Sequence, residues 1–475
     1  MKGNLTVNAI EASSGQPPKI NAASDYTDCA LLVADWSVRP EKRVVYEVDV
    51  ARRIITRRDP RNAAGWTVQM LCDEAHEIIS QSNGKLRRCL IAIDVAIGLP
   101  VGLLSQWAQH AGEKADYANL ADYLRRPPAG ADWLGEAPNA QQWSWDRPYI
   151  RVPPGNGSLT AFRNRAGDLQ INLTRVVDDM TGGKSPLILS GIPGSVGSGS
   201  REVLRELWNC LGDEGWQSRV AVWPFDGPIE ACTSDSTRVV VGEIYPRSLY
   251  GHVLDDAAPA DRRRLVVAKT NRKVRELAVQ ALRQLAWHTQ EETHVRLSDE
   301  YLALAVANED DFDAYFSALG LLRLITEGQS LEDSSLGEWD GRPLLDRSAE
   351  GGMLGLLSAQ AWNDESRFVP PGQHGPPQAG SARTPPNHPA VWTTEAILRA
   401  GQAAIVFTGL PAGSRDNRTN VTIQLDNGAP FQLVIGDHFM IWRAHQQTQD
   451  RTIDFDTLFE ILSGAPGEHH YVTVV

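Results

Sequence analysis

The sequence has few cysteines, no long apolar run and no excess of basic residues. Its 475 residues include five cysteines, which are scattered, odd in number and without any C-x-x-C pair. This pattern argues against a disulfide framework or a zinc cage and favours a reducing cytoplasm. No apolar run approaches the roughly 20 residues that span a bilayer, and the N-terminus carries no hydrophobic signal region. We therefore expect a soluble, cytoplasmic protein without membrane segments.

Acidic residues outnumber basic ones, with 59 Asp and Glu against 46 Lys and Arg and a formal net charge of −13. This balance excludes a uniformly basic surface that coats nucleic acid, although a local basic groove is compatible with it. The length allows roughly two to four domains and ample material for a buried core.

One carboxylate lies inside an apolar stretch. Ile91 to Ile97 is almost entirely aliphatic, contains Asp94, and is closed by Gly98 and Pro100. Such a run is typical of a buried central strand. An Asp there is costly unless it is paired, hydrogen-bonded or bound to metal. Asp94 is therefore the centre from which we look for partners.

The segments around Asp94 predict a mixed α/β domain. Three strands are expected over 29–35, 43–50 and 52–57, with an antiparallel meander favoured by their short connections. Apolar residues at helical spacing predict a helix over 65–82, ended by Asn83-Gly84, before the strand with Asp94. Further on we expect strands over 219–224 and 237–246, a basic helical region over 257–290, and a helix that opens at Asn308.

The rest of the chain divides by composition. Residues 1–26 are expected to be irregular, 27–362 to form the main domain, and about 101–220 to be an insertion of helix and loop. The Pro- and Gly-rich residues 363–388 predict a linker. Residues 389–475 predict a small α/β module with a helix near 394–400, a strand near 404–408, a hairpin over 421–435 and a helix near 455–462.

Four acidic positions can meet at one site. Asp35, Asp94 and Glu243 lie on or at the ends of predicted strands, and Asp310 and Asp313 are three apart at a helix start, so they share a face. Converged carboxylates repel one another unless a cation neutralises them, and oxygen ligands select Mg²⁺ or Mn²⁺. Two such ions about 4 Å apart can activate water and stabilise the leaving oxygen of a phosphodiester.

Each acid also has a structural interpretation. Asp35 can form a turn at a strand end, Glu243 can be a salt-bridge partner, and Asp310 can complement a helix dipole. Spacing alone leaves both interpretations open.

Short motifs that occur in order along the chain carry a family resemblance. They are Val33-Ala34-Asp35, Ile93-Asp94-Val95-Ala96-Ile97-Gly98-Leu99-Pro100, Phe162-Arg163-Asn164-Arg165, Gly194-Ser195-Val196-Gly197-Ser198-Gly199, Trp223-Pro224-Phe225-Asp226, Glu243-Ile244-Tyr245-Pro246, Lys269-Thr270 with Arg275, Asp310-Asp311-Phe312-Asp313-Ala314 and Glu350-Gly351-Gly352-Met353-Leu354. With them the chain, over about residues 28–360, resembles an uncharacterised family of predicted RNase H-fold nucleases, a domain of unknown function. The order of elements is likewise similar to that of the RNase H-like fold.

The resemblance implies a mixed five-stranded sheet flanked by helices, and a divalent-metal-dependent nuclease that hydrolyses phosphodiester bonds of DNA or RNA by a two-metal mechanism. The implied ligands of Mg²⁺ or Mn²⁺ are Asp35, Asp94, Glu243, Asp310 and Asp313, with Lys269 as a further catalytic residue. An alternative of another class is a catalytically inactive module of the same fold that binds nucleic acid or a protein partner. A nucleotide-binding phosphotransfer enzyme is disfavoured, because no phosphate-binding glycine turn follows the first strand.

Several basic and hydroxyl side chains are candidates for binding the substrate phosphates. They are Arg163, Arg165, Arg272, Arg275, Ser195 and Ser198. Cationic side chains can hold a phosphate or stabilise developing charge, and free N–H groups at a helix start can do the same. The competing interpretations are a solvated helix face for Arg272 and Arg275 and a flexible connector around the serines. Arg163 and Arg165 are expected on a loop.

Overall fold

The structure is a computed structural model that divides the chain into two compact units, residues 1–374 and 375–475. The parts of the first unit that it describes are 26–105, 117–126, 132–144, 147–151, 158–189, 196–232, 238–290, 294–332, 336–339, 341–357 and 365–368; in the second unit it describes six strands. The expected irregular segment 1–26 therefore lies, but for its last residue, outside the described residues.

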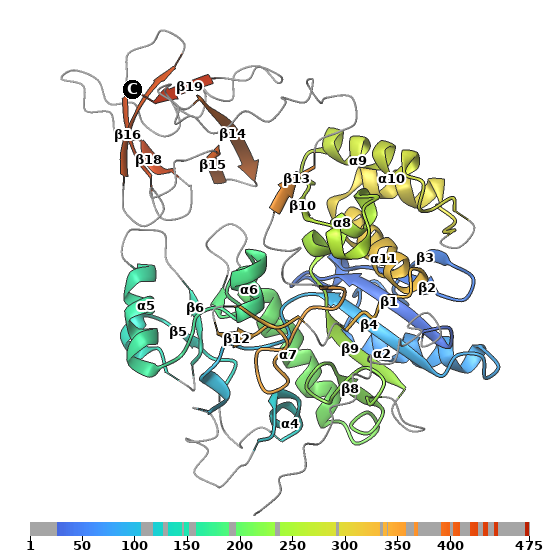
Figure 1. Cartoon of the computed structure of the whole chain (residues 1–475). Coiled ribbons are helices and arrows are strands. Elements are labelled where there is room, and N and C mark those ends of the chain that lie inside the picture. The colour runs from blue at the N-terminus through green and yellow to red at the C-terminus, as the bar shows by residue number, and fades with distance from the viewer. Residues whose placement is uncertain are drawn as a thin grey trace, which may run out of the picture. The chain divides into compact units, whose positions relative to one another are not determined.

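A six-stranded mixed sheet forms the centre of the first unit, in the order β3-β2-β1-β4-β9-β8 (Figure 1). The strands are β1 (Cys29–Asp35), β2 (Val44–Asp49), β3 (Ile54–Arg58), β4 (Arg88–Asp94), β8 (Val220–Val222) and β9 (Val239–Glu243). The antiparallel β1-β2-β3 meander is confirmed, and β1, β4, β9 and β8 run parallel to one another. The mixed α/β class is confirmed, but the expected five strands are six, because the short β8 also pairs with β9.

Successive residues of the central strands face opposite sides of the sheet, and each side has its own core. Ala30, Leu32 and Ile91 belong to a core shared with α2 (Val68–Gln81) and α7 (Gly197–Gly212). Leu31 and Ala92 belong to a second core, shared with α8 (Pro246–Leu254), α9 (Arg272–Gln284), α10 (Asp299–Ala307) and α11 (Glu309–Thr326). The sheet is therefore covered by helices on both faces, as Figure 1 shows.

Local sequence explains where the helices that flank the sheet begin and end. The Thr67 side chain caps α2 by accepting a hydrogen bond from the Met70 amide, and Asn83 and Gly84 take positive φ values after the helix. The Asn308 side chain caps α11 by accepting from the Asp310 amide, and acids occupy its first turn.

In the described residues between β4 and β8, where an insertion of helix and loop is expected, the structure has helices and a small parallel sheet. Its helices are α4 (Leu120–Arg125), α5 (Ser158–Leu169), α6 (Val176–Thr181) and α7, and its strands are β5 (Glu136–Ala137), β6 (Tyr149–Arg151) and β7 (Ile188–Leu189). The helical region expected over 257–290 is helical only in part, chiefly over α9. There, β10 (Arg264–Val266) precedes α9, and it pairs with β13 (Glu365–Arg367), inside the expected linker.

The second unit contains a six-stranded sheet in the order β15-β14-β19-β16-β17-β18. The strands are β14 (Val391–Arg399), β15 (Gln402–Thr408), β16 (Thr419–Leu425), β17 (Phe431–Ile435), β18 (Ile441–Ala444) and β19 (Tyr471–Val474). The strand near 404–408 and the antiparallel pairing over 421–435 are confirmed. The helix expected near 394–400 was wrong, because residues 394–399 pair with β15 as part of β14. The helix near 455–462 lies outside the described residues.

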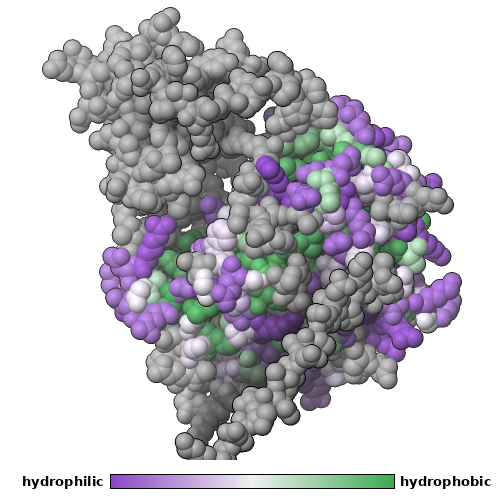
Figure 2. Space-filling model, viewed as in Figure 1, coloured by the Kyte–Doolittle hydropathy of each residue, from purple (hydrophilic) through white to green (hydrophobic). Residues whose placement is uncertain are grey.

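Hydrophilic and apolar areas alternate over the visible face of the first unit (Figure 2). Among the described residues, the large hydrophobic side chains that are exposed are Val38, Val101 and Trp208. The helices in the described part of the chain include none that is both long and apolar enough to cross a membrane.

Candidate metal centre

Asp35 and Asp94 lie side by side at the carboxyl ends of two central strands. In the parallel register of β1 and β4, Asp35 is the partner of Asp94. Each follows, at a spacing of two, residues whose side chains belong to the core beneath α11, such as Val33 and Ala92. The two carboxylates therefore share the face of the sheet that α11 covers.

Asp313 of α11 completes a group of three. One carboxylate oxygen from each of Asp35, Asp94 and Asp313 lies within 4.8 Å of the others. Asp313 is 1% exposed, while Asp35 and Asp94 are partly buried. Three hard oxygen donors at this spacing fit a divalent cation such as Mg²⁺ or Mn²⁺.

Burial and mutual repulsion perturb the two strand-end acids. Burial, and then the neighbouring Asp94, raise the pKa of Asp35 well above its ordinary value, and the Lys269 ammonium acts in the opposite direction. Burial raises the pKa of Asp94 to about 7; Lys269 again lowers it, and Glu243 raises it. Without a bound cation, protons therefore neutralise part of this site near neutral pH.

Both oxygens of Asp313 are engaged within the protein. The Tyr250 hydroxyl, from α8, donates a hydrogen bond to Oδ1, and the Lys269 ammonium forms an ion pair with Oδ2. The Lys269 side chain is 36% exposed whereas that of Asp313 is 1% exposed. A cation is thus already present beside the three acids.

Glu243 does not join this group, although it ends the neighbouring strand. The register pairs it with Ile93, whose side chain faces the α2 and α7 side of the sheet, so Glu243 points to the face opposite Asp94. There its Oε1 and Oε2 accept hydrogen bonds from Nη2 and Nη1 of Arg175 at 2.7 and 2.6 Å, and Oε2 also accepts one from the Ile97 amide at 2.9 Å. The salt-bridge interpretation fits this geometry.

Arg175 is the charged residue that the sequence analysis missed. It is fully buried, pairs with both Asp178 and Glu243, and donates to the Glu350 carbonyl. The Glu350 carboxylate in turn accepts from the amides of Val176 and Val101. This network fixes the loop after Asp94 to α6 and to the turn at 350. The i,i+3 spacing of Arg175 and Asp178 was the only local signal for it.

The two other acids at the start of α11 have different surroundings. Asp310 is partly buried and lies close enough to Asp35 to raise its pKa, but it is not one of the three convergent acids. Asp311 points away from them, as its position on the helix predicts, and accepts hydrogen bonds from the Tyr46 hydroxyl and from Nε of Arg57.

The residues expected to bind substrate phosphates are spread over several elements. Arg275 is buried and donates to the carbonyls of Lys269, Val306 and Ala307. Arg272 is exposed and pairs with Glu276. Arg163 and Arg165 lie on α5 rather than on a loop, and Nε of Arg165 donates to the Trp143 carbonyl at 3.4 Å. Ser198 begins α7, and Ser195 lies outside the described residues.

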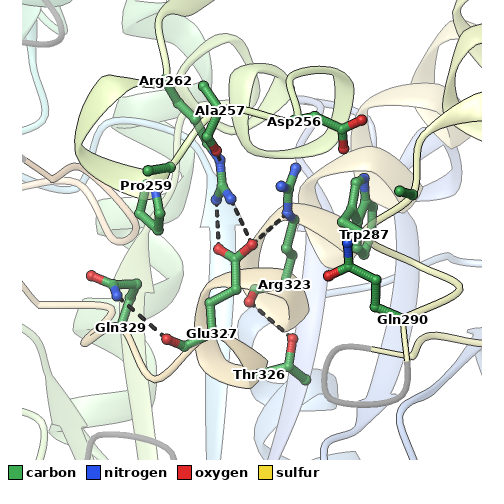
Figure 3. A pocket seen from close by; sticks show the side chains of 12 residues that line it. Asp256, Ala257, Pro259, Arg262, Trp287, Gln290, Arg323, Thr326, Glu327 and Gln329 are labelled. Atoms are coloured by element: carbon green, nitrogen blue, oxygen red, sulfur yellow. Dashed lines mark hydrogen bonds and ion pairs between the residues drawn. The ribbon is translucent and has the colours of Figure 1, made fainter.

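A separate pocket of about 570 Å³ lies between the ends of α8 and α11 (Figure 3). Its buried Arg262 and Arg323 both point to the carboxylate of Glu327. They also donate to backbone carbonyls after or near the end of α8, those of Ala257 and Asp255. Cations at helix C-termini complement the dipole, so the two arginines link the ends of α8 and α11.

Comparisons of the chain with protein-family models, with curated proteins and with solved structures found no match.

Proposed function

We propose that this chain is a divalent-metal-dependent nuclease of RNase H-like fold, which hydrolyses phosphodiester bonds of DNA or RNA. The observation that carries the proposal is the convergence of Asp35, Asp94 and Asp313, from two strand ends and a distant helix, within 4.8 Å. Burying three carboxylates together is unfavourable without a cation. A site that binds a divalent cation would account for this unfavourable arrangement.

The topology of the sheet supports the fold part of the proposal. An antiparallel meander, a helix, a parallel fourth strand beside the first, and acids at the ends of both strands match the arrangement that the resemblance implies. The late helix α11 then brings Asp313 to the same edge.

Asp35, Asp94 and Asp313 would hold the first Mg²⁺ or Mn²⁺, and Asp310, whose charge acts on Asp35, would be a ligand for a second. When bound, such ions polarise the phosphoryl oxygens and lower the pKa of a coordinated water. Asp35 and Asp94, whose pKa values are raised by burial, would release protons as a cation replaces them. The partly exposed Lys269 can reach toward an anionic substrate from the same edge.

Cleavage of a mixed panel of single- and double-stranded DNA, RNA and hybrid, with Mg²⁺ or Mn²⁺, tests the proposal. We expect metal-dependent cleavage that Asp35→Asn, Asp94→Asn and Asp313→Asn abolish while the chain stays folded. Asp73→Asn, an exposed acid on α2, is the matched control and should cut like the parent. Equal cleavage by the parent and the three site variants would contradict the assignment.

The alternative, a non-catalytic module that binds nucleic acid or a protein, is favoured by one observation. Glu243, which the resemblance implies as a ligand, is occupied by Arg175 on the far face of the sheet. A chain that binds nucleic acid equally well with and without Mn²⁺, and cuts none of the panel, would support this alternative.

A further inference from the structure

We propose that Lys269 is a built-in counter-cation, which neutralises the acidic site in the metal-free protein and which a divalent ion must displace to bind. This inference rests on the proposed metal site and concerns its regulation. It assigns Lys269 a role before any reaction, in setting how tightly the site takes up metal.

The charge of Lys269 is directed at the whole acidic group. Its ammonium contacts Oδ2 of Asp313. One carboxylate oxygen of Asp313 lies within 4.8 Å of those of Asp35 and Asp94. One cation is therefore adjacent to three convergent carboxylates that come from β1, β4 and α11, and its charge opposes the rise in pKa that burial causes at Asp35 and Asp94.

The backbone of Lys269 is held in place by Arg275. Lys269 lies in the short connection between β10 and α9, where its amide donates to the Val267 carbonyl at 2.7 Å. Nη1 of Arg275 donates to the Lys269 carbonyl, while Nε and Nη2 bind the carbonyls of Val306 and Ala307 at 3.0 and 3.2 Å. These two residues end α10, directly before the helix that carries Asp313. Arg275 thus fixes the base of Lys269 relative to α11.

The side chain of Lys269, by contrast, can move to solvent. It is 36% exposed, and a lysine stem has four rotatable carbons that allow the ammonium to move to solvent while the backbone stays fixed. The acids that it would leave behind are partly or fully buried. Exchange of this ammonium for a divalent ion therefore needs a rotamer change of one side chain and no rearrangement of the sheet.

The experiment measures Mn²⁺ affinity of the full-length chain by isothermal titration, with Mn²⁺ alone as the probe. A unit charge adjacent to a dication opposes its binding strongly, so Lys269→Met should bind Mn²⁺ at least about tenfold more tightly than the parent. Lys269→Arg, which keeps the charge, should stay within about threefold of the parent. Lys273→Met, an exposed cation in the first turn of α9, is the matched control and should change affinity less than about twofold.

The outcomes separate this inference from the proposed function. If neither the parent nor Lys269→Met binds Mn²⁺, the metal site itself is wrong and the inference falls with it. If the parent binds and Lys269→Met binds equally or more weakly, the metal site stands and the counter-cation role is overturned.

Loss of the cation also predicts a change in stability that metal should reverse. Without metal, Lys269→Met should melt at a lower temperature than the parent, and saturating Mn²⁺ should raise its melting temperature more than that of the parent. Lys269→Gln keeps a polar group beside Asp313, and it replaces Lys269→Met in this experiment if the Met variant does not fold. A Gln variant that stays unfolded in saturating Mn²⁺ overturns the inference, because the ion should replace the missing charge.

Discussion

Replacing Asp94 with asparagine should stabilise the metal-free protein at neutral and alkaline pH. Burial is the main reason that the pKa of Asp94 rises from 3.8 to about 7 in the folded chain. At 1.36 kcal/mol per unit, ionising this carboxyl in the folded rather than the unfolded protein costs roughly 4 kcal/mol. Asparagine has nearly the same shape and never carries the charge, so it avoids this cost.

The sign of the pH dependence follows from proton binding. Between about pH 4 and pH 7 the folded protein holds a proton on Asp94 that the unfolded chain has released. The free energy of unfolding of the parent therefore falls as the pH rises through this window, and is constant with respect to this group above about pH 7. The advantage of Asp94→Asn should grow by roughly 3 kcal/mol from pH 5 to pH 8 and then level off.

Thermal unfolding followed by circular dichroism, with a chelator present, measures this advantage. For a unit of this size we expect the melting temperature of Asp94→Asn to exceed that of the parent by roughly 5 °C at pH 8, and by much less at pH 5. Asp73→Asn, exposed on α2, should match the parent at both pH values. An Asp94→Asn advantage that is absent, or that shrinks as the pH rises, would refute the buried-carboxylate reasoning.

Three further substitutions probe the surroundings of the site. Glu243→Gln should lower the free energy of unfolding by about 3 kcal/mol, because it weakens a buried pair with Arg175. In titration calorimetry it should change Mn²⁺ affinity less than about threefold; a loss of Mn²⁺ affinity as large as that of Asp94→Asn would make Glu243 a ligand. Asp311→Asn should lower the melting temperature, because Arg57 loses its buried partner, and should leave Mn²⁺ binding intact. Asp313→Asn, in contrast, should lose Mn²⁺ binding; loss of binding in both variants would show general damage to α11. Tyr250→Phe removes a donor to Asp313 and should cost about 2 kcal/mol in thermal unfolding without abolishing Mn²⁺ binding.

Much of the central sheet could be predicted from local patterns. The apolar runs of β1 and β4, the helical spacing of α2 and the Asn308 cap of α11 are each determined by neighbouring residues. Because β1 and β4 both end in an acid and pair in parallel with their last residues in register, Asp35 and Asp94 come together.

Glu243 shows why the rest of the site could not be predicted. Its position at a strand end is visible in the sequence, but the face it occupies depends on the register between β9 and β4. Side chains alternate along a strand, so a shift of one residue exchanges the two faces. The bidentate partner, Arg175, comes from a helix in the insertion, and no local pattern links the two.

Arg275 and β14 illustrate a second limit. Basic residues at helical spacing give the same sequence pattern whether they face solvent or backbone carbonyls. Arg275 faces carbonyls, which belong to the end of α10 and to Lys269. Residues 394–400 have apolar spacing compatible with a short helix, but pairing with β15 makes residues 394–399 a strand. In both cases the deciding contacts come from other elements, which the local pattern does not specify.

Acids at the carboxyl ends of the central strands have different roles on the two faces of the sheet. Glu243 is 3% exposed and fully hydrogen-bonded, so its charge is compensated within the protein and stabilises the loop after Asp94. Asp35 and Asp94 remain partly exposed, and their charge is only partly compensated by Lys269. A folded protein that leaves such a group under-compensated gains stability from any cation that binds there and not to the unfolded chain. Under the proposed function, the instability of the metal-free site is therefore also the source of its affinity for metal.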